Sequence, residues 1–274
     1  MAEIIQTKKK NFININELNA YKVAYESKLQ AKDYLFYVGV PAFGFGIFSF
    51  ILLYYWWFSL FMIGIGTLYG LSYFLPKSIK KQYSDHSFNQ RNKFINNMTQ
   101  LLTDSSKTVQ RALLTASERA DGEFQMDINV LQARLMGADN YRIGDGFSEL
   151  SEKYESDIIF VQYLEQLETA MLEGRTNIDT LKDIKAYHND MKRKQNDYEK
   201  KKQGHLKDMK MLAMVIVFFI LAITFSFGFK TYVNAFAHHF TGWITIGIYL
   251  TLMGSFFKKF SKYLFDDSIM EVEK

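Results

Sequence analysis

The sequence contains no cysteine, only two prolines and almost no excess of either charge. The absence of cysteine excludes disulfides, thiolate metal sites and cysteine nucleophiles. The formal net charge of +4 is too small to indicate a nucleic-acid-binding protein. The mean hydropathy of −0.12 resembles that of a soluble protein, but it averages two unlike kinds of sequence. Long stretches lack charge altogether, and these stretches decide the class of protein.

The longest uncharged stretch is residues 34–76, which contain no Asp, Glu, Lys, Arg or His. A helix needs about 20 apolar residues to cross a bilayer core of about 30 Å, so this stretch is long enough for two crossings. The aromatic run at 54–57 in its middle is typical of a membrane interface. We therefore predict a hairpin of two crossings, 34–53 and 58–75, with Pro76 ending the second helix.

Two further stretches with little or no charge lie near the C-terminus. Residues 211–229 contain no Asp, Glu, Lys, Arg or His, and residues 231–257 contain only His238 and His239. These stretches predict a second hairpin of two crossings within residues 211–257. The histidine pair is expected at the outer membrane interface.

Lys and Arg are concentrated outside the two predicted hairpins. The connection at 54–57 carries neither residue, and the connection at 230–239 carries only Lys230. Since short loops rich in Lys and Arg stay on the cytoplasmic side, both termini and residues 77–210 are expected in the cytoplasm. The predicted location is the inner, cytoplasmic membrane.

Residues 77–210 are rich in both charges and contain no proline. Apolar residues recur there at spacings of three and four, which is the pattern of amphipathic helices. The first such stripe comprises Phe94, Met98, Leu101, Leu102, Val109, Ala112, Leu113 and Ala116. Four shorter stripes follow, and we expect glycines to separate them, among them Gly144 and Gly146. The last stripe has no clear breaker except Gly204, so it can continue as one helix into the third apolar stretch.

The predicted fold class is all-α: a polytopic membrane protein with four transmembrane helices and a cytoplasmic helical bundle. The expected order is a cytoplasmic N-terminal segment (1–33), a transmembrane hairpin (34–76), a cytoplasmic helical domain (77–210), a second hairpin (211–257) and a cytoplasmic tail (258–274).

No motif for chemistry is present. The sequence has no phosphate-binding GxxxxGK[ST] loop and no HExxH, so we expect no enzyme, no cofactor and no metal site. His188, on a charged helix, is expected to be solvated or lightly packed. The predicted crossings lack charged residues, which disfavours a transporter or channel. Gly66 and Gly70 form a GxxxG motif, which either marks a close helix contact or reflects the frequency of glycine in membrane helices.

Several motifs follow one another in residues 91–229. They are Leu101-Leu102 before Ala112-Leu113, a glycine-containing turn at 143–150, an acidic helix at 161–168, Leu172-Glu173-Gly174-Arg175, and a charged run at 182–210. Together with the order of crossings, they resemble the inner-membrane platform proteins of type II secretion and type IV pilus machines. The single cytoplasmic F-domain resembles the Tad/Flp-pilus branch of that family.

The resemblance implies a protein that acts by contact. Its expected partners are a secretion-type hexameric ATPase, pilin-like subunits, further copies of itself or a second platform subunit, and membrane lipid, without nucleic acid. Glu168, Glu173 and Arg175, around a turn between two helices, are candidate partner contacts; the alternative is an ordinary solvated turn. The alternative function is a membrane-anchored helical adaptor or signalling scaffold unrelated to pili.

Overall fold

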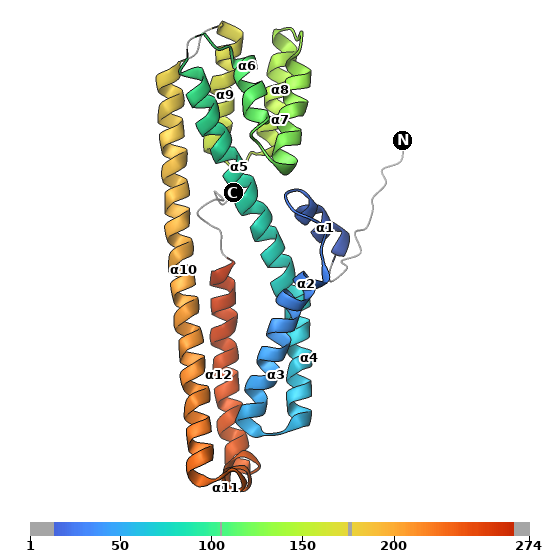
Figure 1. Cartoon of the computed structure of the whole chain (residues 1–274), viewed down its shortest axis with the longest axis vertical. Coiled ribbons are helices and arrows are strands. Elements are labelled where there is room, and N and C mark those ends of the chain that lie inside the picture. Colours follow the sequence, from blue (N-terminus) through green and yellow to red (C-terminus); the bar gives the residue numbers. More distant parts are fainter. Residues whose placement is uncertain (1–13, 105, 175–176, 266–274) are drawn as a thin grey trace. The chain divides into compact units, whose positions relative to one another are not determined.

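The structure is a computed structural model that describes residues 14–104, 106–174 and 177–265 (Figure 1). All regular structure in these residues is helical, so the predicted all-α class is confirmed. The described residues form two compact units. Unit 1 comprises residues 14–23, 27–80 and 208–265, and unit 2 comprises residues 24–26 and 81–207.

Unit 1 contains most of the apolar sequence. Its helices are α1 (Ile15–Val23), α2 (Ala31–Tyr34), α3 (Val40–Leu53), α4 (Trp56–Tyr69), α11 (Phe229–Tyr232) and α12 (Phe240–Leu264), with the π-helical turns η1 (Leu35–Gly39), η2 (Gly70–Phe74) and η3 (Val233–Ala237). It also contains the start of α5 (Leu75–Leu102) and the end of α10 (Ile178–Phe227). In the described chain, four continuous helical segments are long and apolar enough to cross a membrane: Ala31–Leu53, Trp56–Leu102, Ile178–Phe227 and Phe240–Leu264.

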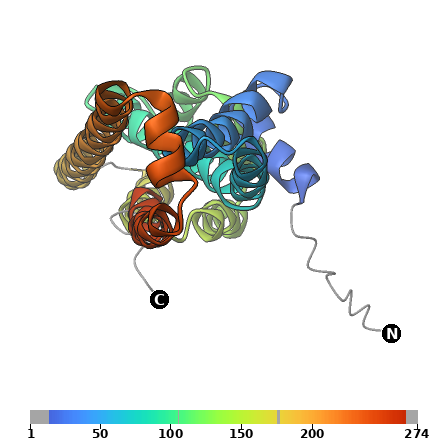
Figure 2. The same ribbon diagram turned by 90° about the horizontal axis from the view of Figure 1, so that it is seen from below.

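Helices α3 and α4 form a hairpin and lie side by side (Figure 1 and Figure 2). The turn depends on Tyr54, whose φ of 52° is in the left-handed region that few non-glycine residues adopt. The Tyr54 ring packs edge-on against Phe229, with 4.9 Å between the ring centroids.

Both prolines follow a π-helical turn. Pro41 comes just after η1 and Pro76 just after η2. In η2 the Leu75 N–H bonds to the carbonyl of Gly70, five residues back. A π turn shifts the hydrogen-bond register by one residue. This shift accommodates the proline ring and the N–H that proline lacks. The helix therefore continues through Pro76, and the prediction that this residue ends it was wrong.

Helix α1 packs against the first turns of α5 within unit 1. Leu18 lies in a small buried cluster with Leu75 and Ile79. Two ion pairs hold the segment around it: Lys22–Asp33 at 2.7 Å and Lys80–Glu17 at 2.9 Å. The first pair is nearly inaccessible to water.

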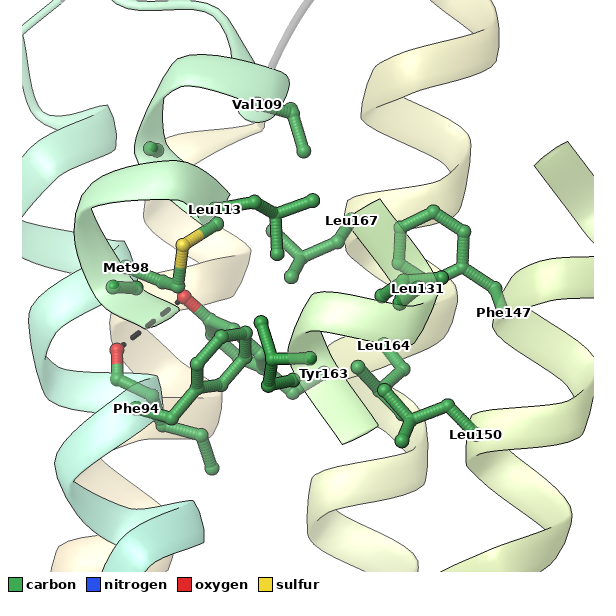
Figure 3. Packing of buried hydrophobic residues seen from close by; sticks show 14 of the residues in the cluster. Phe94, Met98, Val109, Leu113, Leu131, Phe147, Leu150, Tyr163, Leu164 and Leu167 are labelled. Atoms are coloured by element: carbon green, nitrogen blue, oxygen red, sulfur yellow. Dashed lines mark hydrogen bonds between the residues drawn. The ribbon is translucent and has the colours of Figure 1, made fainter. Parts of the chain in front are cut away.

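Unit 2 is a helical bundle with its own apolar core (Figure 3). Its helices are α6 (Val109–Ser117), α7 (Gly122–Leu135), α8 (Asn140–Lys153), α9 (Ile158–Glu173) and the parts of α5 and α10 that belong to this unit. The core is built from the predicted apolar stripes, including Phe94, Met98, Leu113, Leu131, Phe147 and Leu164. The side chains of Thr108, Asp139 and Asp157 cap the starts of α6, α8 and α9.

Gly144 and Gly146 lie inside α8, so the expectation that they separate helices was wrong. A Cβ on Gly146 would lie 3.3 Å from Cδ1 of Leu131 on α7. A Cβ on Gly144 would lie 3.2 Å from Oε1 of Glu168 on α9. These glycines therefore leave room for the Leu131 and Glu168 side chains rather than ending α8.

Candidate functional site

Three charged or titratable side chains meet inside unit 2. Arg91 comes from α5, Asp157 precedes the first residue of α9, and His188 comes from α10. Arg91 Nε donates to Asp157 Oδ2 at 2.7 Å, and His188 Nε2 lies 3.2 Å from the same oxygen. The His188 ring is fully buried and stacks on Phe88, with 4.8 Å between the centroids. The expectation of a solvated or lightly packed His188 was therefore wrong.

Hydrogen bonds around Asn92 indicate which nitrogen of the His188 ring accepts and which donates. Lys192 Nζ donates to Asn92 Oδ1 at 3.2 Å, which orients the amide. Asn92 Nδ2 then donates to Asn189 Oδ1 at 2.8 Å and faces His188 Nδ1 at 2.9 Å. In this arrangement His188 Nδ1 accepts from the Asn92 amide, and Nε2–H donates to Asp157.

Asp157 is held ionised despite its burial. Burial acts to raise its pKa, but the hydrogen bond from His188 and the charge of Arg91 outweigh it and lower the pKa to about 2. The second oxygen, Oδ1, accepts the Phe160 N–H at 3.1 Å and caps α9. Asp157 therefore joins α5, α9 and α10 through one carboxylate.

The contact between α5 and α10 in unit 2 is largely polar. Four pairs follow one another along the two helices: Asn96–Asn189, Asn92–His188, Asp85–Gln195 and Lys81–Glu199. Such networks specify one register of the two helices, because a shifted register leaves buried donors and acceptors unpaired. Because His188 is closed off from solvent, the cluster positions helices and offers no access to a substrate.

A groove of about 410 Å³ lies on the surface of unit 2 between α8 and α9. It is lined by Ser148, Ser151, Glu152, Glu155, Ile158, Val161, Gln162 and Glu165. Ile158 is 47 % exposed, so the groove offers an apolar contact between carboxylates. Its chemistry matches a segment that combines basic and apolar side chains.

Of the three predicted partner contacts, only Glu168 is placed near this groove. Glu168 is half-buried on α9, one turn beyond Glu165; burial raises the pKa of Glu168, and the Glu165 carboxylate adds to this effect. Glu173 is exposed at the end of α9, but five residues on a helix correspond to a rotation of about 140°, so it does not share the face of Glu168. Arg175 lies outside the described residues.

The predicted helix-packing residues Gly66 and Gly70 lie in unit 1, against α3 and η1. A Cβ on Gly66 would lie 2.8 Å from Cα of Ala42 and 2.8 Å from the carbonyl oxygen of Pro41. A Cβ on Gly70 would lie 2.8 Å from Cα of Val38. Both glycines therefore occupy positions where two helix backbones approach closely.

A hollow of about 600 Å³ lies in unit 1 among α10, η3 and α12. Its lining is mostly apolar and includes Phe219, Ile220, Phe236 and Ile246. In the described chain, no three His, Cys, Asp or Glu side chains gather where they could hold a metal ion.

Sequence reasoning missed the cluster of Arg91, Asp157 and His188. A usable signal was present, because His188 occupies an apolar position of the last stripe, after Leu181 and Ile184. A histidine at such a position points into the bundle. Its partners, however, lie far away in the sequence and could not be identified from spacing.

No family model matches the chain, and no solved structure matches it. The chain is 59% identical over 268 residues to a Bacillus anthracis protein named "Uncharacterized protein pXO2-23", and the alignment covers 98% of this chain and 97% of that protein. At this identity and coverage, the chain belongs to the same family as the Bacillus anthracis protein.

Proposed function

We propose that the protein is an inner-membrane platform of a type II secretion or type IV pilus machine of the Tad type. The observation that carries this proposal is the order of elements: two long apolar helices, a helical unit with its own core, and two further long apolar helices. In this role unit 1 crosses the membrane four times, and unit 2 and both termini lie in the cytoplasm.

The two ends of unit 1 support this orientation. At one end, Phe74 packs against Phe265 at 5.6 Å between the centroids, and Lys77 and Lys262 lie close by in sequence. At the other end, Tyr55 stacks on His238 with 3.9 Å between the rings. Aromatic rings are enriched at both membrane interfaces, so the lysines at one end support the orientation and the rings at both ends support the crossing.

A platform acts by contact rather than by catalysis. It binds a hexameric ATPase on the cytoplasmic side and passes the movement of that motor to pilin-like subunits in the membrane. Helices α5 and α10 each contain residues of both units without a break, so each is a covalent path for such movement. The groove between α8 and α9 is the surface that we assign to the ATPase, because its carboxylates and exposed Ile158 suit a basic and apolar segment.

The proposal is tested by cross-linking the tagged full-length protein in the cells that encode it and identifying the captured proteins by mass spectrometry. We expect a secretion-type ATPase and pilin-like subunits. Capture of neither would reject the platform role, and capture of signalling proteins instead would favour the membrane-anchored adaptor.

Charge neutralisation tests the groove separately. Replacing Glu152 and Glu165, which line the groove, with Gln should reduce ATPase recovery about tenfold, because charges at the edge of an interface chiefly tune association. The matched control changes exposed acids outside the groove, Glu118→Gln with Asp183→Asn, and should leave recovery unchanged. Equal recovery from both variants would reject the groove as the contact.

A further inference from the structure

Residues 24–26, which we call the strap, dock onto α5 and α7 within unit 2. The carbonyl oxygen of Ala24 accepts the Glu123 N–H at 2.8 Å. The Tyr25 ring lies 5.6 Å from the Tyr83 ring and stacks on His86 at 5.9 Å, both measured between centroids. The strap therefore makes a backbone contact with α7 and an aromatic contact with α5.

The start of α7 is shaped to receive the strap. Asp121 precedes this helix but makes no side-chain hydrogen bond to its first turn, so the Ala24 carbonyl serves that turn instead. Gly122 has φ +63°, and a Cβ there would collide with the Ala24 carbonyl and lie 2.6 Å from Cδ1 of Tyr25. Docking of the strap thus requires glycine at position 122 both for its conformation and for space.

The docked contact is nevertheless small. His86 Nε2 lies 3.7 Å from Glu26 Oε1, and these side chains are 47% and 43% exposed, so water weakens this pair. Tyr25 itself is only partly buried where it packs against the core of unit 2. Segments with few buried contacts open far more often than the whole fold unfolds.

We propose that the strap is a releasable element with a docked and an undocked state. The docked state covers the first turn of α7 and the rings of Tyr83 and His86. The undocked state exposes both rings and leaves the Glu123 N–H to water. The residues on either side of the strap, 14–23 and 27–80, belong to unit 1, so release converts residues 24–26 from a docked segment into a free connection. This proposal depends on the geometry of unit 2 and is independent of the platform role.

Hydrogen exchange at the Glu123 amide reports directly on the strap, because its acceptor is the Ala24 carbonyl. The measurement uses the full-length protein in detergent micelles. We expect this amide to be protected at least about tenfold relative to a free peptide, and about a hundredfold or more less than the core amide of Leu131. An unprotected Glu123 would show that the strap does not dock. Protection equal to that of Leu131 would show that it leaves only when unit 2 unfolds, and either result would overturn the proposal.

Two variants test what holds the strap. Tyr25→Ala should bring the Glu123 amide to within about twofold of the free-peptide rate, while the Met126 amide, bonded within α7, keeps its protection. Gly122→Ala should do the same by steric exclusion. Its matched control is Gly137→Ala, because Gly137 has a similar φ of +67° but open space around it. Unchanged exchange in Tyr25→Ala, or the same exchange in both glycine variants, would contradict the proposal.

Discussion

Replacing Asp157 with Asn tests the buried cluster that joins α5, α9 and α10. Asn keeps an oxygen for the Phe160 N–H that caps α9, but it removes the charge and puts an amide nitrogen in place of Oδ2, the acceptor for Arg91 and His188. Arg91 is left buried without its counter-charge, and breaking a buried pair in this way costs about 3–5 kcal/mol. We therefore expect unit 2 to be destabilised by several kcal/mol at neutral pH.

The pKa of Asp157 gives a second measure of the same effect. The pKa falls from 3.8 to about 2 in the folded protein, which corresponds to about 2 kcal/mol of stability. Because the folded pKa is the lower one, this contribution is fully present above about pH 5 and is lost as the pH falls towards 2. Asn resembles the protonated acid, so the difference between wild type and Asp157→Asn should shrink over this range of pH. This value of about 2 kcal/mol is smaller than the cost of about 3–5 kcal/mol expected for breaking the pair, because it compares only the two protonation states of Asp157.

The absence of cysteine makes the assay direct. A single Ala170→Cys places a thiol in the buried core of unit 2, and its labelling rate reports the opening of that unit in the full-length protein. A loss of about 3–5 kcal/mol should accelerate labelling by about 150- to 4,000-fold at neutral pH. The control Asp179→Asn, at a side chain that is 86% exposed, should change the rate less than about twofold. Equal rates in both variants, or a difference that does not decline in acid, would refute the role assigned to Asp157.

Three further outcomes are expected. Gly66→Ala brings a methyl group to 2.8 Å from the α3 backbone and should destabilise unit 1 by about 1–3 kcal/mol. The measurement is tryptophan fluorescence, because all the tryptophans lie in this unit. The control Gly64→Ala, with open space around the glycine, should have no effect. A cysteine at Trp57 should react with a membrane-impermeant reagent in intact cells and a cysteine at Asp121 should not, whereas the reverse would overturn the orientation. Residues 78–205 produced alone should be soluble and mostly helical by circular dichroism, and a spectrum dominated by strand would contradict the domain assignment.

The sequence by itself determines the helical class and the placement of the long apolar helices. Residues 34–76 contain no charged residue. In apolar surroundings a stretch of this length forms helices, because a helix satisfies its own backbone hydrogen bonds. The three- and four-residue spacing of the apolar stripes in unit 2 predicts which side chains form its core. These features are local, because propensity and periodicity act within a few turns of one helix.

The tertiary structure decides whether a helix-breaking residue ends its helix. Gly144 and Gly146 would end a helix by propensity, but they remain inside α8, with side chains of α7 and α9 lying against them. Pro76 would end a helix as well, but the π turn before it changes the hydrogen-bond register. In both cases packing or a rearranged backbone outweighs an intrinsic preference of about 1–3 kcal/mol.

The polar contacts show the limit of sequence reasoning most clearly. His188 carries its own signal, since it stands at an apolar position of a helix, but Asp157 and Arg91 precede it by 31 and 97 residues along the chain. The strap is similar, because Ala24 meets a helix start that lies about a hundred residues later. Such pairings are properties of the folded chain, because loop-closure entropy rises so slowly with separation that spacing alone does not restrict which residues meet. Only the three-dimensional arrangement of the helices selects them.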